Sequence, residues 1–160
     1  MAILLYEDIG TIKCPLFPND IDDADEYADF VKDTVASLLE DGAYLHGGFD
    51  EQGCTDNFVS VYLFDVINNY FYEGESALVL QFPEVFQEEV PRGAVVMAGT
   101  ALKAAIEEYD SGALVQKKFL LEIYSPVYDT IKGLMDKLKM NAYHSNKAKN
   151  LRQAWAAGAA

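Results

Sequence analysis

The chain has little cysteine, no long hydrophobic run and few basic residues over its first 110 positions. Its two cysteines, Cys14 and Cys54, are too few for a disulfide framework, and two free thiols are typical of a reducing compartment. The longest stretch without a charged residue is 93–102, far below the roughly 18 apolar residues that span a bilayer. The start of the chain lacks the basic segment and cleavage site of a signal peptide. We therefore expect no membrane partner, and a cytoplasmic protein or one assembled into a particle made in the cytoplasm.

Charge is divided unevenly along the chain. Residues 1–110 hold 23 Asp and Glu and four Lys and Arg, a net charge of −19, whereas residues 111–160 hold three acids and eight bases, a net charge of +5. The acidic part repels phosphates, so direct nucleic-acid binding is expected only through the basic C-terminal helices. No shift in composition marks a boundary, and 160 residues suit one domain. We predict a single domain over 1–160, with an acidic body (1–110) and basic C-terminal helices (111–160).

Apolar residues recur at spacings of three and four, which is typical of helices. The pattern predicts a mainly α fold, a compact bundle of five to six helices, with at most a minor strand at 2–6 near the N-terminus or at 77–82. The expected helices are 21–39, 55–72, 94–109, 113–124, 126–140 and 145–157. The helix at 55–72 is apolar on most faces, which predicts a central or interfacial position. Gly99 either destabilises its helix or allows another element to approach closely.

Capping residues and prolines mark the expected helix ends. Asn19 or Asp20 is the expected cap of the first helix, and Thr55 that of the second. Ser125-Pro126 is typical of a helix start, because proline suits the first helical position. The first helix carries acids opposite its apolar stripe, which predicts a solvated negative face.

Reactive side chains gather in one glycine-rich segment, which holds His46, Asp50, Glu51 and Cys54. A thiol near an imidazole and a carboxylate can form a nucleophilic site, and the same atoms can bind a metal. The flexible spacing favours the simpler interpretation that Cys54 is a small buried residue. The acids at 20–25 fail as a calcium loop, since Ala24 occupies a ligand position and no glycine follows. We therefore predict no catalytic residue, no metal and no cofactor, and keep a small thiol enzyme using Cys54 as an alternative.

The charge division suggests a non-enzymatic interaction or assembly protein that binds a protein partner or copies of itself. It would be a subunit of a larger complex, for example a component of a viral or phage particle. The expected partner-binding residues are, on the acidic face, Asp22, Glu26, Asp29 and Asp33, and, on the basic C-terminal segment, Lys147, Lys149, Arg152 and Trp155. An alternative is that the acidic face, with Glu88 and Glu89, imitates nucleic acid and inhibits a DNA-binding enzyme. A further alternative for the basic segment is that it folds back on the acidic body of its own chain.

Overall fold

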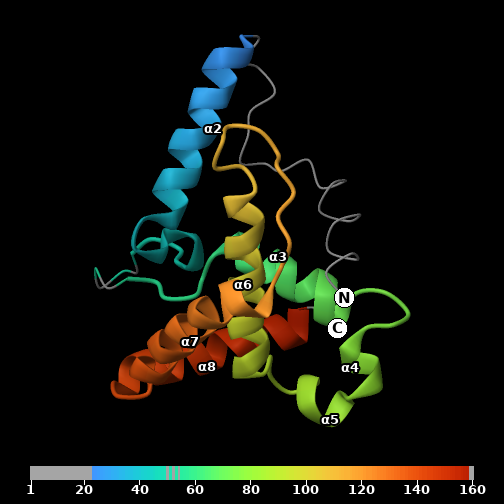
Figure 1. Ribbon diagram of the computed structural model, residues 1–160. Coiled ribbons are helices and arrows are strands. Elements are labelled where there is room, and N and C mark those ends of the chain that lie inside the picture. Colours follow the sequence, from blue (N-terminus) through green and yellow to red (C-terminus); the bar gives the residue numbers. More distant parts are fainter. Residues whose placement is uncertain (1–22, 50, 52, 54, 159–160) are drawn as a thin grey trace.

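The computed structural model describes residues 23–49, 51, 53 and 55–158, and this part of the chain is mainly α (Figure 1). Its elements are α2 (Ala24–Leu39), the 3-10 helix η1 (Glu40–Leu45), α3 (Val61–Ile67), the π-helical turn η2 (Asn68–Tyr72), α4 (Leu78–Gln81), α5 (Pro83–Phe86), α6 (Arg92–Glu107), α7 (Leu121–Leu138) and α8 (Ala142–Gly158). The mainly α prediction is confirmed. The possible strand at 77–82 is instead the short helix α4, and the possible strand at 2–6 lies outside the described residues.

Helix α2 begins at a carboxylate cap. The side chain of Asp23 accepts hydrogen bonds from the backbone N–H groups of Asp25 and Glu26, at 2.9 and 3.0 Å. This cap satisfies two of the donors that a helix start leaves open. The predicted caps, Asn19 and Asp20, lie outside the described residues. Val31 and Val35 form the buried face of the helix, as its apolar stripe predicts.

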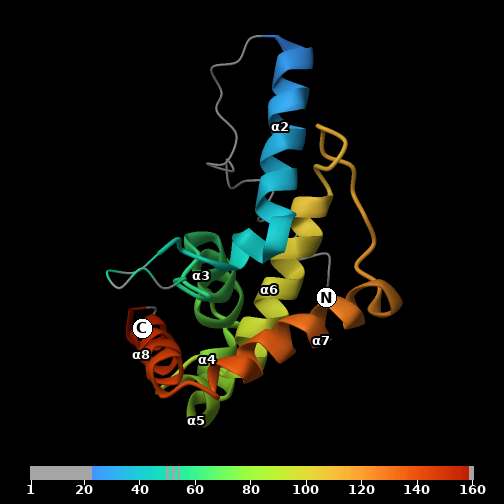
Figure 2. The same cartoon turned by 90° about the vertical axis from the view of Figure 1, so that its left-hand side faces the viewer.

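Helix α6 runs through the centre of the molecule and packs against α3, α7 and α2 (Figures 1 and 2). Its sequence is rich in alanine, valine and glycine, and these small side chains let its neighbours approach closely. A Cβ on Gly99 would lie 2.9 Å from Leu45 Cδ2 and 3.4 Å from Ile131 Cδ1. Gly99 is therefore a point of close packing, the second of its two predicted roles.

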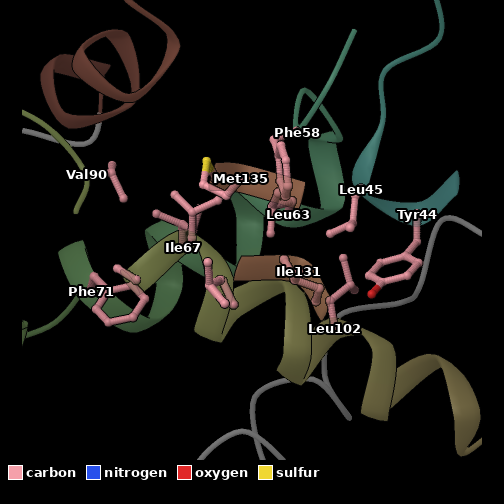
Figure 3. Packing of buried hydrophobic residues seen from close by; sticks show 14 of the residues in the cluster. Tyr44, Leu45, Phe58, Leu63, Ile67, Phe71, Val90, Leu102, Ile131 and Met135 are labelled. Carbon is pink, nitrogen blue, oxygen red and sulfur yellow. The ribbon is translucent and has the colours of Figure 1, made fainter. Parts of the chain in front are cut away.

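The main apolar core lies around α6 (Figure 3). Leu63 and Ile67 of α3 are fully buried there, and Ile131 and Met135 of α7 close the other side. Burying one such side chain contributes roughly 1.5–3 kcal/mol to folding. The segment 55–72 therefore does reach the core, although Val61 at its start is 60% exposed.

The predicted helix start at Thr55 is wrong. Two backbone hydrogen bonds engage residues near Thr55 instead: Gly47 N–H donates to Asp56 O and Asp56 N–H donates to Gly48 O, at 3.0 and 2.8 Å. An isolated antiparallel bridge joins Phe49 to Thr55. Because these backbone groups pair with one another, they are not available to a helix, and α3 begins only after Ser60.

The predicted helix 113–124 is also wrong for residues 113–120, which have no regular structure. Their backbone is held by α6 instead: Val115 N–H donates to Glu108 O, and Lys117 N–H donates to the Glu108 carboxylate, both at 2.8 Å. The helix break expected at Pro126 does not occur, because α7 runs through it from Leu121 to Leu138. The missing N–H leaves the carbonyl of Glu122 open, and both residues are exposed, so water can satisfy it.

Helix α8 closes the structure against the body. Asn141 caps it by accepting a hydrogen bond from Tyr143 N–H at 2.9 Å. Ala148, Arg152 and Ala156 form its buried face. No helix in the described part of the chain is long and apolar enough to cross a membrane.

Candidate functional site

The acidic end of the molecule is the solvent face of α2. Three of its predicted partner-binding residues, Glu26, Asp29 and Asp33, are exposed along this helix, and Asp22 lies outside the described residues. Lys32 pairs with Asp29 at 2.9 Å and is the one base of the helix. An exposed pair of this kind contributes little to stability, so the face keeps a strong negative field.

An apolar strip lies in the connection between α6 and α7 and the first turn of α7. Six of its side chains are between 38% and 77% exposed: Leu114, Val115, Phe119, Leu120, Leu121 and Ile123. The connection begins beside α2, because Gly112 packs directly against the backbone of Ala28 (Figure 1). Adjacent exposed apolar side chains on this scale are typical of interaction surfaces. In the sequence, these apolar residues led to the predicted helix 113–124.

The strip is anchored to the body at Tyr124. Phe119 stacks on the Tyr124 ring, with centroids 4.7 Å apart. The Tyr124 hydroxyl donates to Glu107 Oε2 at 3.1 Å. Burial, followed by this hydrogen bond and the nearby carboxylates, raises the pKa of Tyr124 to about 12, so its hydroxyl stays a donor at neutral pH.

The basic end of the molecule is α8, and its predicted residues differ in what they contact. Lys147 forms an ion pair with Asp56, and Arg152 pairs with Glu89 at 3.1 Å. Trp155 packs on Phe64, with ring centroids 5.7 Å apart. Lys149 is exposed and forms no ion pair within the described residues. The basic segment therefore does fold onto the acidic body of its own chain, and Lys149 is the predicted residue that faces solvent.

The two charged helices lie at opposite ends of the molecule. In both views α2 points away from the body at one end and α8 crosses the other (Figures 1 and 2). The predicted acidic and basic residues are therefore not brought together into one site. They form two separate surfaces on one framework, joined by the central helix α6.

A small cavity, the basic cleft, opens at the basic end between the start of α6, the end of α7 and α8. Its volume is about 100 Å³. Four cations, Arg92, Lys139, Lys149 and Arg152, line it together with Ser145. The remaining wall is apolar and is formed by Met135, Leu138 and Ala148. Among the described residues, no carboxylate lines this cavity, although the whole chain has a net charge of −14.

The two arginines of the basic cleft are held by fixed partners. Arg92 donates to the carbonyl of Met135 and lies 3.6 Å from an Asp136 carboxylate oxygen. Arg152 donates to Ala148 O at 3.2 Å and to Glu89. Desolvation and the positive charge of Arg152 lower the pKa of Arg92. The negative charges of Asp136 and Glu89 act in the opposite direction, and Arg92 stays charged at neutral pH.

The basic C-terminal segment predicted from the sequence includes Lys139, Lys149 and Arg152, but Arg92 was not predicted to join them. Arg92 is one of only four bases in the first 110 residues, and that rarity was the available signal. Its position at the first turn of α6, 60 residues before Arg152, concealed the relationship. Only the packing of α8 across the α6–α7 junction brings them together.

The glycine-rich segment shows no assembled reactive site within the described residues. The Nδ1 atom of His46 is buried without a hydrogen-bond partner there, its ring packs edge-on against Phe58, and burial lowers its pKa. Asp50 and Cys54, which the thiol hypothesis requires, lie outside the described residues. No group of three or more potential metal ligands occurs among the residues that the structure describes.

A second hollow, of about 320 Å³, lies between η1, α6 and α7. Its lining is mostly apolar and includes Leu39, Leu134 and Tyr44. Burial raises the pKa of Tyr44 well above its usual value, so its hydroxyl remains protonated. Lys103, which also lines the hollow, is neutralised by Glu107. This hollow therefore offers apolar surface with little charge, in contrast to the basic cleft.

Comparison with known families identifies the chain. A family model described as a domain of unknown function, DUF6532, matches residues 17–138, well over half of the chain, so the protein belongs to this family. No curated protein and no solved structure matches it. The matched range ends with α7, so α8 lies outside the family match. Five of the residues that line the basic cleft also lie outside it: Lys139, Ser145, Ala148, Lys149 and Arg152.

Proposed function

We propose that this protein is a non-enzymatic interaction module that associates head to tail with copies of itself. The observation that carries this proposal is the position of the acidic α2 face and the basic α8 end at opposite ends of one framework (Figures 1 and 2). Two such surfaces cannot meet within one molecule, but they are complementary between molecules. A contact between unlike surfaces of identical chains builds rings or filaments.

The acidic end also carries apolar surface. The apolar strip lies beside α2, and its exposed side chains can bury apolar area on association, which ion pairs alone do not provide. Complementary charge accelerates encounter and sets orientation, while burial of apolar surface supplies most of the free energy. The proposal extends to a subunit of a larger assembly made in the cytoplasm, of which a virus-like particle is one example.

The test is the molar mass in solution, measured by light scattering after size exclusion at low and at high ionic strength. Head-to-tail association should weaken with salt, because the screening length falls from about 10 Å at 0.1 M to about 3 Å at 1 M. A protein that stays monomeric at low ionic strength over the accessible concentration range would contradict the proposal.

Charge reversal identifies the surfaces. The triple variant E26K/D29K/D33K should lose association, and so should Lys149→Glu, because each meets a like charge on the neighbouring molecule. A mixture of the two variants should regain association, since the reversed α2 face then meets the reversed α8 end. The control is E75K/E84K/E88K, which changes net charge equally at exposed positions outside α2.

The triple variant E26K/D29K/D33K also separates this proposal from nucleic-acid mimicry. A mimic would act through acidic surface and bind a basic groove as a monomer, without a contribution from Lys149. Glu89, one of its expected phosphate substitutes, is already engaged by Arg152. Loss of DNA competition in E26K/D29K/D33K, with no change in molar mass, would favour mimicry over self-association.

A further inference from the structure

We propose that the basic cleft binds a phosphoryl group, either as free phosphate or at the end of a phosphate monoester. This inference concerns a small anionic ligand and does not depend on the proposed self-association. It rests on the lining of the cavity, the arrangement of its two arginines and its size.

The charges around the cavity sum to an excess that a dianion would neutralise. Four cations line the cavity. Two carboxylates, Glu89 and Asp136, pair with these cations but do not line it. Asp136 is shared between Arg92 and Lys139, at 3.6 and 3.0 Å. Four positive and two negative charges leave an excess of 4 − 2 = +2. A phosphate monoester carries about −1.5 to −2 at neutral pH, whereas a carboxylate would compensate only half of the excess.

The arginines are organised before any ligand arrives. Arg92 is held by the Met135 carbonyl, and Arg152 is buried along α8 between Ala148 O and Glu89. Side chains fixed in this way lose little conformational entropy when they bind a ligand. Each guanidinium has five N–H donors and uses few of them, and Nε of Arg152 has no hydrogen-bond partner within the described residues.

The presence of two arginines in one small cavity also points to an anion, because an anion bound there would meet both guanidinium groups. Arginine forks match the oxygens of a phosphoryl group, which is why they recur where phosphate is recognised.

The size of the cavity is sufficient for a phosphoryl group. A volume of about 100 Å³ has room for several waters, and therefore for a small tetrahedral anion. The rest of a monoester would extend past Lys139 and Lys149, which are exposed at the edge of the cleft.

Isothermal titration of the full chain at constant ionic strength tests this proposal. Inorganic phosphate and phosphoserine should bind saturably, while serine should not. Equal binding of the two phosphorylated probes, or a preference for phosphoserine, indicates a phosphorylated side chain or metabolite as the natural source. Binding of inorganic phosphate alone indicates the free ion. Absence of saturable binding by both would overturn the proposal.

Variants locate the binding. Arg92→Gln should weaken phosphate binding at least about tenfold, because it removes a charge-assisted contact. Lys149→Gln should weaken phosphate binding by up to about fivefold, the effect of one exposed ion pair. Because Lys149 is exposed, this variant should fold like the wild type. The control is Lys132→Gln, an exposed lysine of α7 outside the cleft. Equal phosphate affinity in wild type, Lys149→Gln and Lys132→Gln would place any binding elsewhere and reject the site.

Discussion

Arg152 of α8 donates through Nη2 to Oε1 of Glu89 at 3.1 Å, across 63 residues of sequence. The Arg152 side chain is only 9% exposed, and that of Glu89 is 33% exposed. The neighbouring backbone strengthens the connection, because Val90 N–H donates to Arg152 O at 3.2 Å. This pair joins the acidic and basic parts of the chain within one molecule, and its arginine lines the basic cleft.

Replacement of Arg152 by Met should weaken the contact between α8 and the segment that carries Glu89. The variant loses the hydrogen bonds to Ala148 O and to Glu89 and leaves a partly buried carboxylate, at a cost of about 1–3 kcal/mol in the free energy of unfolding. Urea denaturation followed by circular dichroism measures it. The control is Lys149→Met on the same helix, which should change stability by less than about 0.5 kcal/mol. Equal stabilities of the two variants would show that the pair contributes nothing.

Trp155 is the only tryptophan, so its fluorescence reports whether α8 is docked. Its ring packs on Phe64. Phe64→Ala should shift the emission to the red and lower the free energy of unfolding by about 2 kcal/mol, since an aromatic pair and apolar area are lost. Val61→Ala, at an exposed position of the same helix, is the control and should leave the emission maximum unchanged. A red shift in both variants would mean that α3, rather than the docking contact, is being monitored.

Gly112 and Gly133 should respond in opposite directions to alanine. Gly112 has φ +89°, and a Cβ there would lie 2.6 Å from Ala28 O, so Gly112→Ala should cost at least about 2 kcal/mol. Gly133 lies inside α7 with open space around it, so Gly133→Ala should stabilise the protein by up to about 1 kcal/mol. Thermal unfolding of both variants measures this. Stabilisation by Gly112→Ala would refute the contact between the α6–α7 connection and α2.

The contribution of Glu108 to the free energy of unfolding should decrease as pH rises. Burial raises its pKa above the ordinary 4.5, and the hydrogen bond from Lys117 N–H offsets this only in part. The folded state therefore binds the proton more tightly than the unfolded state, so the contribution is present below the unfolded pKa and is lost as pH rises through the folded one.

The measurement compares wild type with Glu108→Gln, which keeps an acceptor for Lys117 N–H but does not titrate. The difference in unfolding free energy should move in favour of the variant as pH rises from the unfolded pKa through the raised pKa of the folded state. Parallel pH profiles of wild type and Glu108→Gln would show that the buried carboxyl is not destabilised.

Much of the fold was predictable because local signals and tertiary packing agree. The stripe around Val31 and Val35 predicts α2, and the apolar spacing within 94–109 predicts α6. The non-helical structure at Thr55 and the irregular 113–120 segment could not be predicted in the same way. There, backbone groups bond to partners distant in sequence, such as Val115 N–H to Glu108 O, and helical periodicity carries no information about such partners.

By itself, the sequence determined the mainly α class, the acidic face of α2 and the basic character of the C-terminal segment, because helical spacing and charge are properties of neighbouring residues. The tertiary structure decided which charges meet. It placed α2 and α8 at opposite ends, paired Arg152 with Glu89, and brought Arg92 to the same cavity as Lys149. The physical reason is that ion pairs and cavities depend on how the helices pack, and the packing of α8 across α6 and α7 follows from burial of Ala148, Arg152 and Ala156, not from any local pattern of charge.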